Sequence, residues 1–301
     1  GSLIEAAINL SYSLMPPLTR TIFPQLGVFV GSFDIAAARA VLLLNSDTSR
    51  RGAPPDTLDA LDAPDAPEDS EPTSSDFLSE HLALLCERRL LDYDTTTERY
   101  RLHDAIRIFA FKRLEGQANP VHLRHARHYA QVAEQAAALH REGGASRRAG
   151  QALFDMEFIQ IDVAWGWLRE QPPTPEHDTL LLTYANATAE VGRPHYTTRE
   201  DRIPQLETML EAARRREQPT TTGVALMSLG LAYKMVGNPR RALTYYEQAL
   251  PLVQELDDPH MLGTLAGSLG QVYAEVGELR RALAYHEQHL DMARTTGDIP
   301  G

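Results

Sequence analysis

Residues 229–233 read Leu-Gly-Leu-Ala-Tyr, and Gly237 follows after three intervening residues. Residues 269–273 read Leu-Gly-Gln-Val-Tyr, and Gly277 follows at the same spacing. The two stretches begin 40 residues apart, at 229 and at 269. Self-similarity at a fixed period is the sequence signature of a repeat protein, in which neighbouring units stack and bury a shared core. The 40-residue period therefore predicts a repeat protein.

Each unit contains two apolar faces with helical spacing. The first is formed by Leu226, Leu229, Gly230 and Tyr233, and the second by Ala242, Tyr246, Ala249 and Val253. Both sets follow the i, i+3 or i+4, i+7 rule of an amphipathic helix. Gly230 and Ala242 are small where the two helices must approach closely, and the tyrosines fill the remaining space. The sequence therefore predicts a helical hairpin as the repeating unit.

These small and aromatic positions resemble the tetratricopeptide repeat, although the period is 40 residues instead of the ~34 of that family. We expect a tetratricopeptide-like α-solenoid over residues 178–301, with complete units at about 222–260 and 261–298 and an earlier, degenerate unit at 178–217. The second complete unit departs from the pattern at His286 and His289. The chain stops where a further unit would begin, so we expect a truncated array and a C-terminal fragment of a longer protein.

The resemblance also suggests where a partner binds. Met227, Leu231 and Met235 form an i, i+4, i+8 stripe apart from the core stripe, and in the family such positions lie on a concave face that binds a protein or peptide. Lys234 and Gln271 are expected on the same face. The alternative, that the stripe packs against preceding helices, is equally compatible with the spacing.

Residues 3–118 are predicted to form a winged-helix domain, with helices, a strand at 26–30 and a hairpin from segments 90–94 and 99–102. Asp34 is expected to cap a helix over 35–44. Residues 46–76 contain two basic and nine acidic residues and repeated prolines, which predicts an irregular surface insertion. A helical linker is expected over 119–177. The predicted fold class is therefore mainly α with one small β-hairpin.

Several stretches of this N-terminal region resemble the winged-helix domain of signalling ATPases of the STAND class, NB-ARC type. They are Asn9–Leu14, Pro16-Pro17, Val28-Phe29, Phe33-Asp34 and Tyr100–Asp104. Leu102-His103-Asp104 resembles the Met-His-Asp motif of that family. The resemblance implies that His103 contacts the β-phosphate of ADP, that Asp104 supports it, and that an upstream nucleotide-binding module is the domain's own partner. From spacing alone, His103-Asp104 is better explained as a helix cap, and only the family resemblance favours the phosphate contact.

The chain itself is not expected to be an enzyme. It contains no G-x-x-x-x-G-K-[ST] stretch, and therefore lacks the backbone cradle and lysine that nucleotide hydrolysis requires. We expect no cofactor in this chain, and ADP or ATP in the full-length protein. The function implied is the regulatory and sensor half of a signal-transduction ATPase.

Charge bears on the alternative function, a DNA-binding transcriptional regulator that uses the winged helix. The chain has 29 basic and 41 acidic residues, a net charge of −12. Residues 77–114 contain seven basic and six acidic residues, a net of +1. Because neutralising phosphates needs a clear basic excess on one face, this balance disfavours nucleic acid as a partner.

Composition indicates a cytoplasmic protein. Cys86 is the single cysteine, which excludes an internal disulfide, and no apolar run reaches the ~18 residues of a membrane helix. His122, His125 and His128 share a helical face, but a solvated basic face explains them better than a metal site. Gly1-Ser2 resembles a scar of tag removal. Leu279, Leu283 and Leu290 are expected to form an uncovered stripe that permits weak self-association.

Overall fold

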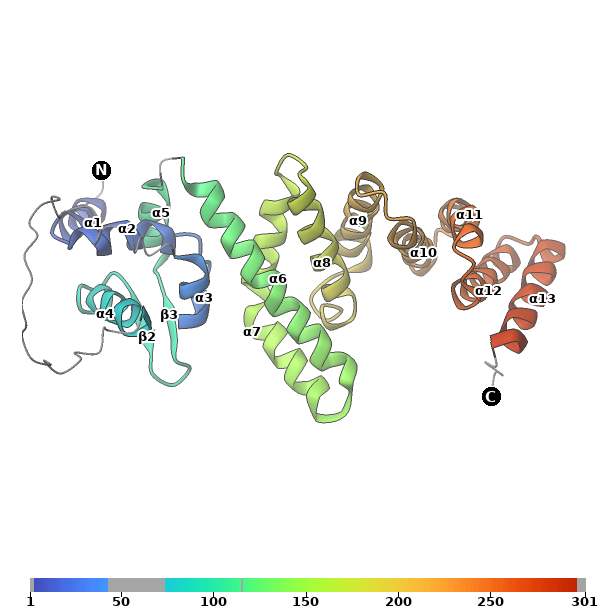
Figure 1. Ribbon diagram of the computed structural model, residues 1–301, viewed down its shortest axis with the longest axis horizontal. Helices are drawn as coiled ribbons and strands as arrows, with labels where there is room; N and C mark the ends of the chain where they lie inside the picture. The colour runs from blue at the N-terminus through green and yellow to red at the C-terminus, as the bar shows by residue number, and fades with distance from the viewer. Residues whose placement is uncertain (1–2, 43–73, 115, 297–301) are drawn as a thin grey trace, which may run out of the picture. The chain divides into compact units, whose positions relative to one another are not determined.

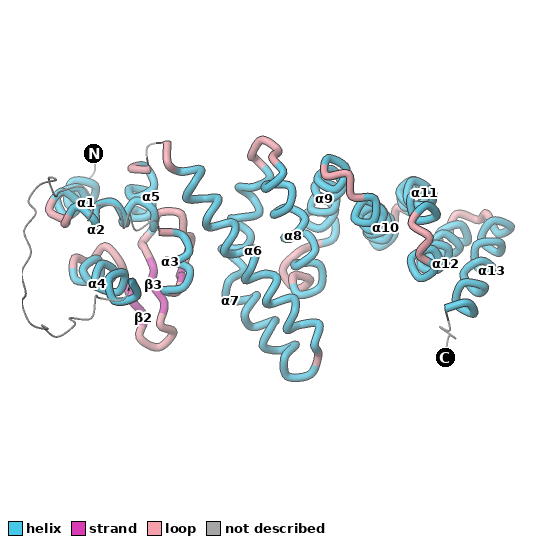
Figure 2. Tube along the Cα trace, viewed as in Figure 1, coloured by secondary structure: helices cyan, strands magenta, loops and turns pink. Residues whose placement is uncertain are grey.

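The computed structural model describes residues 3–42, 74–114 and 116–296 (Figure 1). Helices dominate the described chain, and the strands are short (Figure 2). The predicted class, mainly α with a helical solenoid, is confirmed. The chain divides into an N-terminal unit, residues 1–129 with 159–164, and a repeat unit, residues 130–158 with 165–301. Among the described residues, no helix combines the length and the apolar character needed to cross a membrane.

The N-terminal unit contains five short helices and a three-stranded antiparallel sheet. The helices are α1 (Leu3–Ser13), α2 (Pro17–Leu26), α3 (Ile35–Val41), α4 (Ser74–Glu87) and α5 (Asp104–Lys112). The strands are β1 (Ser32–Phe33), β2 (Asp92–Asp94) and β3 (Arg99–Arg101), in the order β1-β3-β2. The predicted hairpin is therefore present, with Tyr93 opposite Tyr100. The predicted insertion at 46–76 lies outside the described residues, except for its last three, which begin α4.

The strand predicted at 26–30 is wrong. Leu26 ends α2, and the next residues turn tightly, because Phe29 N–H donates to Leu26 O at 3.2 Å. Val28 and Phe29 are both buried, at 2% and 0% exposure, so the apolar run marks a buried turn rather than an alternating strand. The strand lies slightly later, at β1, where Phe33 pairs with Tyr100. The Asp34 cap is confirmed, since Ala37 N–H donates to Asp34 Oδ1 at 2.7 Å.

The expectation of a solvated basic face at three histidines is also wrong. His125 is fully buried and donates from Nε2 to Gln160 Oε1 at 2.9 Å. Burial lowers the pKa of His125 to about 3 and that of His122 to about 4, and it also lowers the pKa of His128. The three rings are therefore neutral packing groups near pH 7. In the described residues, no cluster of three or more His, Cys, Asp or Glu side chains is arranged to hold a metal ion.

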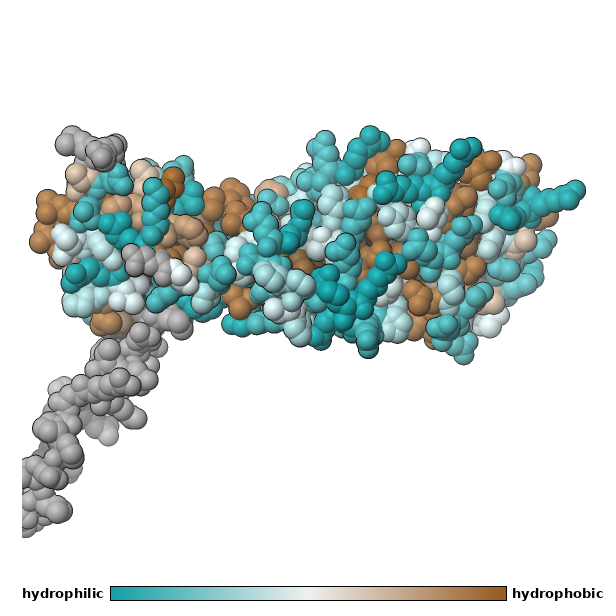
Figure 3. All heavy atoms as spheres, turned by 90° about the horizontal axis from the view of Figure 1, so that it is seen from above, coloured by the Kyte–Doolittle hydropathy of each residue, from teal (hydrophilic) through white to brown (hydrophobic). Residues whose placement is uncertain are grey.

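The repeat unit is built from successive antiparallel helices. Two long helices contribute residues to both units. α6 (Ala118–Glu142) belongs to the N-terminal unit up to residue 129 and to the repeat unit after it. α7 (Gly144–Arg169) belongs to the repeat unit except for residues 159–164. The elements that follow are α8 (Pro175–Val191), the π-helix η2 (Thr198–Arg202), α9 (Ile203–Arg215), α10 (Pro219–Met235), α11 (Pro239–Glu255), α12 (Pro259–Glu275) and α13 (Leu279–Thr296). On the face seen in Figure 3, hydrophobic side chains of the repeats form bands between polar ones.

Close packing inside each pair follows the predicted small and aromatic positions. A Cβ on Gly230 would overlap the ring of buried Tyr246, so glycine is required where α10 meets α11. In the next pair, His286 takes the place of that tyrosine, and a Cβ on Gly270 would lie 2.7 Å from its Cε1 atom. The departure at His286 therefore changes the chemistry of the contact but keeps its geometry.

Neighbouring pairs are joined by a repeated contact. Tyr233 donates its hydroxyl to Glu207 Oε1 at 3.1 Å, and Tyr273 donates to Glu247 Oε1 at 2.7 Å. Each acceptor lies 26 residues before its tyrosine. Because Glu207 and Glu247 are 40 residues apart, α9 is in the same register as α11. The left-handed residue that ends the second helix also recurs, with φ 51° at both Glu217 and Asp257.

Candidate functional site

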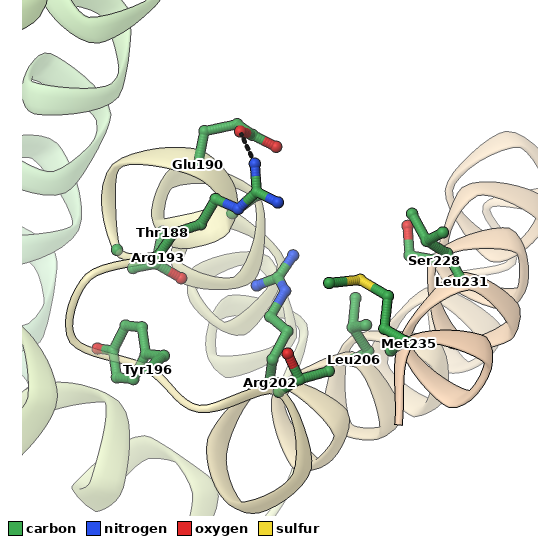
Figure 4. Close-up of a pocket in the computed structure, with 13 residues that line it drawn as sticks. Thr188, Glu190, Arg193, Tyr196, Arg202, Leu206, Ser228, Leu231 and Met235 are labelled. Atoms are coloured by element: carbon green, nitrogen blue, oxygen red, sulfur yellow. Dashed lines mark hydrogen bonds and ion pairs between the residues drawn. The ribbon is translucent and has the colours of Figure 1, made fainter. Parts of the chain in front are cut away.

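Two cavities meet on α10 and form the candidate site. The first cavity, of about 230 Å³, lies between α8, η2, α9 and α10 (Figure 4). The second cavity, of about 390 Å³, lies between α10 and α12 and includes Met227 and Met261. Leu231 and Ser228 line both cavities. The two cavities together form one groove across the first helices of three successive pairs, which we name the α10 groove.

The predicted partner-binding residues lie in or beside this groove. Leu231 and Met235 are 52% and 59% exposed, so preceding helices do not cover them. Met227 is half-buried in the wall of the second cavity. Lys234 donates from Nζ to Gln271 Oε1 at 2.5 Å and lies 3.6 Å from Glu275 Oε1. Lys234 and Gln271 therefore link α10 to α12, and the three apolar residues supply the groove surface.

The first cavity is polar on the side opposite Leu231 and Met235. Arg202 projects into it from the end of η2, as the close-up shows (Figure 4). Arg193 also lines the cavity and forms an ion pair with Glu190 at 3.2 Å. The charged groups of the lining are thus two arginines and one glutamate, a net charge of +1. This local excess is opposite in sign to the −12 of the whole chain.

The cavity arises where the α8–α9 pair departs from the repeat. α8 contains 17 residues, as α10 does, but it ends at Val191, which is 44 residues before Met235 ends α10. The first helix of this pair is therefore displaced along the chain relative to the 40-residue period. The connection that follows leads into the π-helix η2 before α9 begins. Such π-helical turns are rare and often occur at functional sites. The connection at residues 192–197 is longer than the one at 236–238 in the next pair, and this connection and the π-helical turn both line the cavity.

Arg202 stands at a position that is small in the other pairs. Counting 40 and 80 residues onward from 202 gives Ala242 and Ala282, which are buried at 0% and 4% exposure. Arg202 donates from Nη1 to Ala185 O at 2.8 Å and to Gln205 Oε1 at 3.1 Å. Sequence reasoning did not identify this arginine, although the 40-residue register contained the necessary signal.

His103 and Asp104 lie at the start of α5 in the N-terminal unit. His103 occupies the N-cap position without a side-chain cap, and its Nε2 atom lies 3.0 Å from Asp92 Oδ2. The His103 side chain is 69% exposed. Asp104 instead lies 3.6 Å from Arg107 Nε, one helical turn on. Asp92 was not predicted, because only the register of β2 on β3 brings it beside the His103 ring.

Comparisons with known proteins agree with the repeat fold. Residues 205–295 match the family model of the tetratricopeptide repeat. Three curated mycobacterial proteins, one from Mycobacterium bovis and two from Mycobacterium tuberculosis strains, are each 26% identical to this chain over 269 residues. Their names describe them as predicted HTH-type transcriptional regulators. The match covers 85% of this chain but 26% of their length, so this chain spans about a quarter of the relatives it matches.

Two solved structures are similar at low identity. One is a STAND protein with a tetratricopeptide repeat sensor from Pyrococcus horikoshii, 13% identical, with a TM-score of 0.34. That match covers 97% of this chain and 53% of the other. The second is aspartyl phosphate phosphatase F from Bacillus subtilis, 15% identical, with a TM-score of 0.39, covering 75% of this chain and 62% of the other.

Proposed function

We propose that this chain is the regulatory and sensor part of a signal-transduction ATPase, and that its repeats bind a peptide segment of a partner protein in the α10 groove. The observation that carries the proposal is the pair of cavities that meet at exposed Leu231. Adjoining cavities with apolar walls fit successive side chains of one extended chain. The tetratricopeptide match over residues 205–295 supports a protein-binding role.

A selection from a random peptide library displayed on phage tests the sensor proposal. The wild-type chain is expected to enrich peptides that a Leu231→Glu variant does not bind, because a charge in the groove opposes an apolar ligand. The matched control is Leu290→Glu, since Leu290 is also exposed but lies on α13. Enriched peptides that bind all three proteins equally contradict the groove as the binding site.

For the N-terminal unit, we propose a winged-helix domain that contacts a nucleotide-binding module elsewhere in the full-length protein. The helices followed by the β2–β3 hairpin support this proposal. In it, His103 donates a hydrogen bond to a phosphate of ADP, and Asp92 rather than Asp104 orients the ring. The exposed position of His103 leaves it accessible to such a ligand.

ADP retention by a longer chain that carries the nucleotide-binding module tests this second part. His103→Ala is expected to speed ADP loss by about 10- to 100-fold, because one hydrogen bond to a charged group is removed. Asp92→Asn is expected to have a smaller effect in the same direction. His260→Ala, an exposed histidine in the repeats, is the matched control. Unchanged ADP loss in the His103 variant contradicts the phosphate contact.

A role in transcription is the second candidate, favoured by the names of the mycobacterial relatives. In a winged-helix domain the helix before the hairpin commonly reads DNA, and here that helix is α4. Its sequence contains Asp76, Glu80 and Glu87 and no Lys or Arg. An acidic helix repels phosphates. We therefore propose that any control of transcription acts through another part of the full-length protein, and a salt-dependent duplex-binding titration of this chain tests it.

A further inference from the structure

Arg202 is a cation without an anionic partner in the described part of the chain. Both of its acceptors, Ala185 O and Gln205 Oε1, are uncharged, and no carboxylate there lies within ion-pair distance. Burial lowers the pKa of Arg202, although nearby Glu190 opposes the shift. A partly desolvated guanidinium that lacks a counter-charge gains strongly from an incoming anion.

The remaining charges of the cavity favour a ligand with a single negative charge. Arg193 is already paired with Glu190 at 3.2 Å, which leaves Arg202 as the uncompensated cation. Glu190 also repels a dianion such as a phosphate monoester. Leu231 and Met235 provide an apolar wall across from Arg202, seen in the close-up (Figure 4). A carboxylate beside an apolar side chain matches both surfaces.

The course of the groove favours a side-chain carboxylate over a chain terminus. Leu231 and Ser228 line both the first and the second cavity, so the two cavities adjoin at these residues. A cavity of about 230 Å³ holds a side chain rather than a folded segment. A peptide that crosses from one cavity to the other therefore presents successive side chains to them.

We propose that Arg202 binds the carboxylate of an Asp or Glu side chain in the partner peptide, and that a neighbouring apolar side chain of that peptide packs on Leu231 and Met235. This inference rests on the proposed peptide-binding function and names the chemistry of its ligand. It assigns to Arg202 a recognition role that the regular pairs, with alanine at this position, do not have.

The peptides selected on the wild-type chain provide the test. We expect Asp or Glu next to a Leu, Ile, Met or Phe to be enriched among them. The Glu→Gln (or Asp→Asn) analogue of the tightest peptide is expected to bind about 10- to 100-fold more weakly by fluorescence anisotropy, because one charge-assisted contact is lost. This analogue leaves the protein, and therefore its folding, unchanged.

Protein variants then locate the contact. Arg202→Gln is expected to bind the acidic peptide and its amide analogue equally weakly, while Arg202→Lys retains part of the preference. The matched control is Arg199→Gln, since Arg199 is exposed on the same π-helix, does not line the cavity, and contacts Val236 O at 3.4 Å. That control is expected to retain the full preference for the acidic peptide.

Three outcomes overturn the inference, and they are distinguishable. Groove-dependent peptides without acidic enrichment overturn the role of Arg202 but leave the sensor proposal standing. Loss of binding on amidating the peptide C-terminus, with no effect of the side-chain amide, shows that a terminal carboxylate is the ligand and overturns the assigned source. Peptides that do not depend on Leu231 overturn both the inference and the proposed function.

Discussion

The second helices of the α10–α11 pair and the α8–α9 pair share one register, but the two pairs differ in how they are held together. In α10–α11, glycine against tyrosine closes the interface, with Gly230 under the Tyr246 ring. In the α8–α9 pair, Leu206 stands 40 residues before Tyr246, so a leucine takes the place of the tyrosine. There the pair is joined by an ion pair between α8 and α9, with Arg215 Nη2 2.6 Å from Asp178 Oδ1.

A repeat array can therefore form a cavity where one pair departs from the pattern of the others. Where small and aromatic residues interlock, the space between helices is filled and the residues are interchangeable between units. Where leucine replaces the tyrosine, arginine replaces the alanine and the connection between the helices is longer, a cavity with its own charge remains. We therefore expect the unfolding free energy to depend on a different contact in each of the two pairs.

The largest effect is expected from Asp178→Ala. The Asp178 side chain is 5% exposed and accepts from both Nε and Nη2 of Arg215. Removing one member of such a pair costs about 3 kcal/mol of unfolding free energy, at the lower end of the range because Arg215 is partly open to solvent. Urea denaturation followed by circular dichroism measures the loss. Glu211→Ala is the control, because Glu211 lies 3.8 Å from Arg215 and is 71% exposed. If Asp178→Ala and Glu211→Ala have equal unfolding free energies, the ion pair does not hold the α8–α9 pair together.

The next effect is expected from Gly230→Ala, at about 2 kcal/mol of destabilisation, since the added methyl group overlaps the buried Tyr246 ring. Gly166→Ala is the matched change in α7, where no atom lies within 4 Å of the new Cβ. It is expected to stabilise by about 0.5–1 kcal/mol. Adding Tyr246→Leu to Gly230→Ala is expected to relieve the overlap. A neutral Gly230→Ala change, measured in the same urea experiment, contradicts the interlocked packing.

A smaller effect is expected from Tyr273→Phe, which removes the hydrogen bond to Glu247 Oε1 at 2.7 Å. The expected loss is about 1 kcal/mol. Tyr233→Phe is expected to lose less, because its bond to Glu207 Oε1 is longer, at 3.1 Å. Double-mutant cycles with Glu247→Gln and Glu207→Gln isolate the two couplings. Equal couplings indicate that the junction with α9 is as tight as the junction between the regular pairs.

The same tyrosines predict sensitivity to alkali. Burial and the bonds to glutamate raise the pKa of Tyr233 and of Tyr273 to about 12, from about 10 in the unfolded chain. The folded state favours the neutral phenol, so this stabilisation is complete below about pH 10 and is lost as the pH rises to about 12. The Phe variants are expected to lose this part of the pH dependence in urea titrations. A dependence that persists in the double Phe variant contradicts the assignment.

The smallest effect concerns the outer face of α13. Leu283 and Leu290 are 61% and 41% exposed, whereas Leu243, the counterpart of Leu283 on α11, is half-buried. We propose that this face associates weakly with a second copy of the chain. Leu283→Glu with Leu290→Lys is expected to reduce the concentration dependence of light scattering, while the exposed control Gln288→Glu leaves it unchanged. A strict monomer, or an oligomer unaffected by the double change, contradicts this proposal.

The repeat, the helical class and a separate stripe that includes Leu231 could be predicted from the amino-acid sequence. A 40-residue period with glycine, alanine and tyrosine at fixed spacing is a local signal repeated in each unit. It can therefore be recognised without knowing which helices pack against one another. Helix caps such as Asp34 and the β2–β3 hairpin are local in the same sense. The stripe that includes Leu231 was visible for the same reason, because helical spacing alone separates it from the core face.

The burial of polar side chains and the residues that they contact followed from the tertiary structure and could not be predicted from the sequence. Residues 26–30 are apolar throughout. Their tertiary packing, and not their hydropathy pattern, determines that they form a turn. His125 is neutral because burial lowers its pKa to about 3, although the hydrogen bond to Gln160, 35 residues away, opposes this shift. Arg202 lines a cavity together with residues of α8 and α10 that are distant from it in the chain. Burial and charge depend on contacts between residues distant in the chain, and the local sequence does not specify them.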